Sequence, residues 1–221
     1  MEADIRYKPS FAAIFLKLVP GEFIMAEADA MVSMDEGTQI RTKFNGGFLP
    51  ALLRRIFGKE SMFVNVFSCP KHKASSDLVL SQAFPGDIVP IELHGTMMYL
   101  QPGAFVACTS GIKLGVGYAG IRSWINREGL FRLKVSGRGI VWIGAYGGIF
   151  EREVQNEYIV DTGHLVAYEP TLSIGLGLAG GVFSSFFGGE GLVARMRGQG
   201  KIYMQSRSMD GLAAWTNAHL Y

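Results

Sequence analysis

The sequence repeats a short pattern three times, which limits the chain to architectures built from similar units. The pattern begins at Glu60, Glu128 and Glu190, and each copy continues with residues that favour β-strands. Glu60 and Glu128 are separated by 68 residues, and an independent pair of turn glycines, Gly37 and Gly103, by 66. Two landmarks with nearly one spacing indicate an internal repeat.

The middle copy, residues 128–144, has the clearest local pattern. Phe131, Leu133 and Val135 stand at every second position, as in a strand. The Ser-Gly-Arg-Gly segment 136–139 is typical of a turn, and the β-favouring run 140–143 follows it. We therefore expect a β-hairpin here, and corresponding hairpins after Glu60 and Glu190.

Turns followed by β-favouring runs continue along the whole chain, and its 29 glycines suit many short strands with tight turns. The predicted fold class is all-β. We expect residues 1–221 to form a single unit with internal repeats at approximately 11–68, 77–144 and 148–207. The tail 208–221 is expected to contain a short helix with Asp210 as its N-cap.

Three glycine-bracketed connections, 46–58, 115–126 and 180–189, are expected to form one or two helical turns each. They carry large apolar residues at similar places in the three copies, which makes them a candidate interaction rim. The alternative is that these residues plug the ends of the β units as core. The candidate rim residues are Phe48, Leu49, Phe57, Ile121, Trp124, Phe183, Phe186 and Phe187.

Charge and cysteine usage exclude some classes of protein. The net charge is +2, and the densest basic clusters, 54–55 and 71–73, are small, so we do not expect nucleic-acid binding. Two isolated cysteines, Cys69 and Cys108, fit a reducing compartment. The acidic residues 1–4 do not resemble a secretory signal. The expected location is the cytoplasm, with peripheral membrane association as the alternative.

Residues 170–189 contain no charged side chain over 20 positions, the length of a membrane-spanning helix. Six of these residues are glycine, which disfavours a helix, and residues 171–178 alternate like a strand. We therefore expect a strand and a glycine-rich connection in this segment.

No pattern in the sequence indicates catalysis, a cofactor or a metal. The four histidines lack zinc-site spacing, and His94 has Glu92 as its one local partner. His94 and His164 fall near matching places in their copies, so we expect structural roles for both. Residues 115–120 fit GxGxxG but lack the strand–helix context of a nucleotide site. The chain is expected not to be an enzyme and to bind no cofactor.

Several segments together resemble the family of the altered-inheritance-of-mitochondria protein 24, a mitochondrial-biogenesis family. The resemblance covers nearly the whole chain and is carried by residues 86–91, 188–192, 198–207 and 210–215. It implies three repeats, each like a subunit of the tryptophan RNA-binding attenuation protein, with a double-stranded β-helix-like form. It also implies that three chains close into a ring. It implies no established molecular activity, while the yeast relative is associated with inner-membrane organisation.

The function expected from these observations is a non-enzymatic β-ring scaffold or binding protein. One alternative is a peripheral membrane-associated organiser, and another is a small-molecule or RNA-binding ring. The expected partners are two further copies of the chain, with an unidentified protein or a membrane surface as additional candidates.

Replacing Phe183, Phe186 and Phe187 together by serine separates the two interpretations of the rim. If these residues are core, each truncation should cost about 3 kcal/mol or more and the protein should melt early. If they form a docking rim, the melting temperature should hold while sedimentation with liposomes or recovery of a cellular partner falls. Early melting with unchanged partner recovery in the folded fraction would contradict docking.

Overall fold

A computed structural model of the chain describes residues 1–44, 63–118, 131–178 and 192–220. The described structure is all-β with one α-helix, as the sequence predicts. The strands are β1 (Glu2–Arg6), β2 (Ala13–Leu18), β3 (Phe23–Glu27), β4 (Met31–Met34), β5 (Gln39–Phe44), β6 (Phe63–Ser68), β7 (Ser76–Ser81), β8 (Gly86–Leu100), β9 (Phe105–Thr109), β10 (Ile112–Tyr118), β11 (Phe131–Tyr146), β12 (Ile149–Val154), β13 (Glu157–Asp161), β14 (Leu165–Tyr168), β15 (Ser173–Leu178), β16 (Leu192–Arg197) and β17 (Gly200–Gln205). A 3-10 turn, η2 (Thr162–His164), precedes β14, and helix α3 (Met209–His219) ends the described chain.

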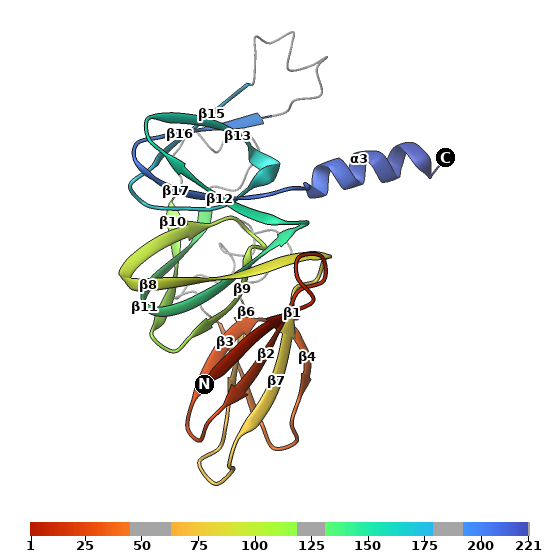
Figure 1. Ribbon diagram of the computed structural model, residues 1–221, viewed down its shortest axis with the longest axis vertical. Helices are drawn as coiled ribbons and strands as arrows, with labels where there is room; N and C mark the ends of the chain where they lie inside the picture. Colours follow the sequence, from red (N-terminus) through yellow and green to blue (C-terminus); the bar gives the residue numbers. More distant parts are fainter. Residues whose placement is uncertain (45–62, 119–130, 179–191, 221) are drawn as a thin grey trace.

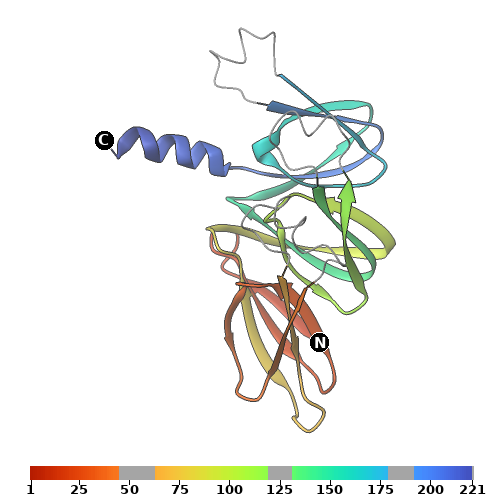
Figure 2. The ribbon, with the colours of Figure 1, turned by 180° about the vertical axis from the view of Figure 1, so that it is seen from behind.

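The strands form three antiparallel sheets. The largest sheet extends through the whole length of the molecule, because β3 and β6 lie at one end beside β1, β2 and β7, β8 to β11 lie in the middle, and β12 and β17 lie at the other end beside β13, β15 and β16 (Figure 1). The N-terminal sheet has the order β1-β2-β7-β4. The largest sheet runs β12-β17-β14-β8-β11-β9-β3-β6-β5, with β10 also paired to β11, and the third has the order β13-β16-β15. Seen from either side, α3 projects sideways from the C-terminal end of the molecule (Figures 1 and 2).

The hairpin predicted around Gly137 is wrong, because residues 131–146 form the single long strand β11. Its register against β8 shifts between Gly137 and Arg138, which marks a β-bulge. A bulge bends a strand and increases its twist without reversing the chain. The other two predicted hairpins are also wrong, because the two strands of each do not pair with each other. β6 and β7 lie in different sheets, as do β16 and β17.

Hairpins form instead between the strands on either side of the undescribed segments. β5 pairs with β6, β10 with β11, and β15 with β16, each in continuous register. The landmark glycines Gly37 and Gly103 therefore precede strands in different positions. After Gly37 comes β5, which pairs with β6, whereas after Gly103 comes β9, which pairs with β11 and β3.

Buried apolar side chains gather in three clusters that follow one another from the N-terminal to the C-terminal strands, and the first and third each combine residues of two sheets. The first joins β2, β3 and β7 to Trp142 of β11, which is almost fully buried. The second surrounds β8, β9 and β11, and the third lies between the strands from β12 to β17. Trp142 thus belongs to a central strand but packs into the N-terminal cluster, so the core continues across the sheet boundary.

The C-terminal helix begins after a different residue from the one predicted. Ser208 is the N-cap, and its hydroxyl oxygen accepts a hydrogen bond from the Gly211 backbone N–H, whereas Asp210 lies in the first turn. Residues 173–178 form the predicted strand within the uncharged segment. In the described part of the chain, no helix is long and apolar enough to cross a bilayer.

Trp142→Ala should lower the free energy of unfolding by about 3–5 kcal/mol, because the substitution leaves a large cavity at the boundary of two clusters. Trp142→Phe retains most of the apolar volume and serves as the matched control, with a smaller expected loss. Urea unfolding followed by circular dichroism measures both. A loss below about 1 kcal/mol for Trp142→Ala would contradict the packing described here.

Candidate interaction surface

All eight residues of the candidate rim lie outside the described part of the chain. The structure does describe the strand ends from which the three connections start and to which they return. Phe44 is paired with Phe63, Tyr118 with Phe131, and Leu178 with Leu192. Each connection therefore leaves from and returns to neighbouring strands of one hairpin, which gives the three connections the same placement relative to their flanking strands.

A second candidate surface, which the sequence analysis missed, is the free edge of β4. In the described structure β4 pairs with β7 and with no other strand. Met31, Val32 and Met34 are all exposed on this short strand. An exposed apolar edge strand offers unpaired backbone groups and a hydrophobic surface to another strand. Three apolar residues among the four of β4 were the available signal.

The free edge of β13 is the counterpart of this surface at the other end of the chain. β13 pairs with β16 and with no other described strand, and its Ile159 is exposed. Glu157, at the start of the strand, accepts hydrogen bonds from Arg197 Nε at 2.9 Å and Arg195 Nη1 at 3.0 Å. Hydrogen bonds from Arg197 and then Arg195 lower the pKa of Glu157 below its usual value. These ion pairs anchor β13 on β16 and leave the opposite edge open.

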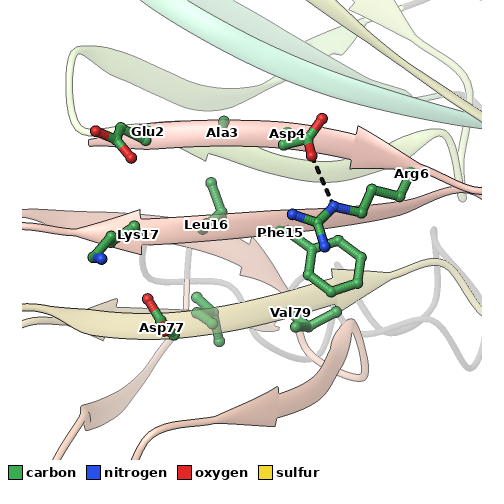
Figure 3. A pocket seen from close by; sticks show the side chains of 10 residues that line it. Glu2, Ala3, Asp4, Arg6, Phe15, Leu16, Lys17, Asp77 and Val79 are labelled. Atoms are coloured by element: carbon green, nitrogen blue, oxygen red, sulfur yellow. Dashed lines mark hydrogen bonds and ion pairs between the residues drawn. The ribbon is translucent and has the colours of Figure 1, made fainter.

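The other edge of the N-terminal sheet differs from β4 because it is covered by charged residues. Figure 3 shows the shallow pocket on β1, β2 and β7, where Arg6 reaches back to Asp4. Arg6 Nε lies 2.7 Å from Asp4 Oδ2, and the guanidinium carbon lies 4.3 Å from the centre of the Phe15 ring. The register places Lys17 between Glu2 and Asp77. Charged edge strands of this kind resist pairing with other sheets.

A buried arginine lies within the largest sheet, where it connects β11 to β14. Arg132 on β11 is almost fully buried, donates a hydrogen bond to the Tyr168 hydroxyl and lies over the Tyr168 ring. Burial raises the pKa of Tyr168, while the charge of Arg132 opposes that rise. Tyr99 packs beside Tyr168 with ring centres 5.3 Å apart. The phenol therefore stays neutral and serves the arginine as a hydrogen-bond acceptor.

The histidines do not occupy matching places, which corrects that part of the sequence prediction. His94 is exposed on β8, 3.6 Å from Glu92, whereas His164 ends η2 with Nδ1 2.8 Å from the Gln205 carbonyl oxygen. Among the described residues, no group of three or more side chains is arranged to hold a metal ion.

Both cysteines are buried free thiols. Burial raises the pKa of Cys108 to about 12, so its thiol stays protonated and unreactive near neutral pH.

An open groove beside α3 is lined by both polar and apolar residues, and within the described structure no buried charged group points into it. It is formed by Tyr146, His164, Ser206, Arg207, Ser208, Gly211, Leu212 and Trp215.

Comparison with known proteins identifies a family and similar bacterial proteins. The sequence profile of a family described as Mitochondrial biogenesis AIM24 matches residues 3–207. An uncharacterised protein of Streptococcus pyogenes serotype M6 is 27% identical over 233 residues, covering 100% of this chain and 91% of that protein. A crystal structure of a Streptococcus pyogenes protein has a TM-score of 0.79 and 26% identity, covering 99% of each chain.

The arginine pair on β16 should set the titration of Glu157. Because the pKa in the folded protein lies below the usual 4.5, the ionised carboxylate favours folding above that pH, and this contribution is lost as the pH falls through the lowered pKa. Arg197→Gln should raise the pKa of Glu157, measured by NMR titration of the side-chain carboxyl carbon. Lys201→Gln, which removes the partner of Glu151 at 3.3 Å, is the control and should leave it unchanged. An ordinary pKa for Glu157 in the unaltered protein would contradict the assignment.

Proposed function

The chain belongs to the Mitochondrial biogenesis AIM24 family, and from this premise we propose that it is a non-enzymatic β-protein that acts as a scaffold or binding platform. Fold alone does not define function, so the proposal rests on how the strands and connections of this chain are arranged. The observation that carries it is a pattern of strand pairing that occurs three times.

Each occurrence of the pattern contains two three-stranded groups. The first occurrence contains β3-β6-β5 and β2-β7-β4. In the second, the long strands β8 and β11 serve both groups, with β10 completing one and β9 the other. The third contains β13-β16-β15 and β12-β17-β14. We interpret these groups as three repeats over about 13–81, 86–146 and 149–205, which moves the first boundary beyond the one expected from the sequence.

This arrangement supports a platform because every repeat carries its long connection at the same place. The segments 45–62, 119–130 and 179–191 each join the two paired strands of the corresponding hairpin. Each repeat would thus present one connection in an equivalent position, and several weak contacts on one molecule can add to strong overall binding. The apolar residues of these segments, such as Phe48, Trp124 and Phe186, are the proposed contacts.

We further propose that the protein is a homotrimer, in which nine repeats form a closed ring like that of the tryptophan RNA-binding attenuation protein. The free edges of β4 and β13 support assembly, because β4 belongs to the first repeat and β13 to the third, and each has an edge that is open to another copy. Contacts between unlike edges form a ring when the rotation from chain to chain closes.

Light scattering coupled to size exclusion should give a mass of about three times the chain mass of 24.1 kDa. Native mass spectrometry of the protein purified from its own cell should show the same assembly and any retained partner. A monomer at micromolar concentration would contradict the ring.

The two alternative functions, a nucleic-acid-binding ring and a membrane-associated organiser, predict different experimental results. Sub-micromolar affinity for a defined RNA at physiological salt would favour the nucleic-acid-binding ring, although a net charge of +2 leaves few phosphates to be neutralised. Sedimentation of the intact protein with liposomes would favour the membrane-associated organiser.

A further inference from the structure

β4 is more exposed than β9 and β14, the two strands that pair with their neighbours through the same kind of register shift. β4 meets β7 with a register shift between Met31 and Ser33, so Val32 is the bulged residue. β14 meets β17 with the same shift between Leu165 and Ala167, around Val166. β9 meets β11 with a shift that leaves Val106 between Phe105 and Ala107. A valine occupies the bulge in all three strands, so β4, β9 and β14 hold equivalent positions.

The burial of these three valines differs sharply. Val32 is 60% exposed, whereas Val106 is 0% and Val166 2% exposed. β9 and β14 each have a second strand on their other edge. β3 pairs with β9, and the end of β8 pairs with β14. The exposed β4 edge therefore corresponds to a position that is filled at both junctions within the chain.

β13 has the features of the strand that would fill this position. The same five-residue separation connects β3 and β8 to the bulged strand that follows each of them, from Ala26 to Met31 and from Leu100 to Phe105. Val160 precedes Leu165 by the same five residues, which makes β13 equivalent to β3 and the end of β8. Its outer edge has no partner in the described structure, and Ile159 is 47% exposed.

We propose that β4 of one copy pairs antiparallel with β13 of a second copy, with Ser33 opposite Val160 and Met34 opposite Ile159. The register follows from the two junctions within the chain. Ala26 is opposite Ala107 and Met25 opposite Cys108 at one, and Leu100 is opposite Ala167 and Tyr99 opposite Tyr168 at the other. The inference rests on the proposed ring and identifies the surfaces that join its copies.

The chemistry of the two edges fits this pairing. Met34 and Ile159 are both apolar and exposed, and their contact would remove both side chains from water. β4 lies in the N-terminal sheet and β13 near the C-terminal end of the molecule (Figure 1), so the two edges meet between copies rather than within one. The far edge of the N-terminal sheet is closed to the same contact by the charged residues of β1 (Figure 3).

A disulfide between copies tests the register directly. Residues directly opposite on paired strands have Cβ atoms about 4.5–5.5 Å apart, close enough for cysteines to be cross-linked. The Met34→Cys, Ile159→Cys double variant should form covalent multimers up to the trimer after mild oxidation, seen on a non-reducing gel. Each single variant alone should stay uncross-linked, and an equal mixture of the two should give covalent dimers. The native Cys69 and Cys108 are buried and should not contribute.

The control for register is the Glu36→Cys, Ile159→Cys double variant, which places the first thiol two residues away at an exposed position and should cross-link at least about tenfold less. Absence of cross-linking in the Met34→Cys, Ile159→Cys variant, in a protein that light scattering shows to be trimeric, would overturn the edge pairing and leave the ring standing. A monomeric unaltered protein would overturn both.

Val32→Lys provides an independent test without cysteine chemistry. Because Val32 is exposed in the single chain, lysine should leave the chain folded but place a charge in the contact. The concentration for half-assembly should rise by at least about tenfold, measured by analytical ultracentrifugation. Ile40→Lys is the matched control, because Ile40 is an exposed residue of β5, which is neither of the two strands proposed to pair, and should leave assembly unchanged. An unaltered trimer with Val32→Lys would contradict the proposal.

Discussion

The pairing of β8 with β11 is the interaction on which the rest of the described structure depends. These two long strands stay in antiparallel register from Leu100 and Leu133 at one end to Gly86 and Tyr146 at the other, interrupted by one bulge. β14 joins the outer edge of β8, while β9 and β10 join β11. Through β9 the ladder continues to β3, so one pair of strands connects the N-terminal and C-terminal parts of the molecule. The β8–β11 ladder also brings Trp142 into the N-terminal cluster. Side-chain packing therefore joins the N-terminal strands to β11, as backbone pairing does through β9 and β3.

The fold class and many strands could be predicted from the sequence, but how the strands pair could not. Alternation identified β-structure around Phe131 and Leu133 because a strand repeats every two residues whatever its partner is. The glycines 137 and 139 indicated a turn, yet they adopt φ values of +128° and +148° within a continuous strand. The close approach of another backbone explains this use of glycine. A Cβ at Gly137 would lie 2.3 Å from the Gly111 carbonyl oxygen. Such a contact between distant segments leaves no local signal in the sequence.

The candidate site was likewise predictable only where it depends on local sequence. The apolar connections could be found from composition, and they lie in segments outside the described residues. The free edges of β4 and β13 could not be found, because a strand is an edge only relative to the strands beside it. The pattern of small and apolar residues around Val32, Val106 and Val166 is visible in the sequence, but its spacing is uneven. Arg132 further obscures the repetition, because the equivalent positions in the hairpins β5–β6 and β15–β16 are valines, Val64 and Val193.

Helix α3 differs from the rest of the molecule because none of its eleven residues is buried. Isolated helices shorter than about 12–15 residues are marginal in water, and here packing against the sheets adds little. We therefore expect the helix to open locally without unfolding of the β-sheets. Its amide protons should exchange with solvent through brief local openings, whereas those of β11 exchange through much rarer, larger openings. The chain would then combine a slowly exchanging body with a fast-exchanging terminal segment, which gives one polypeptide two levels of kinetic protection.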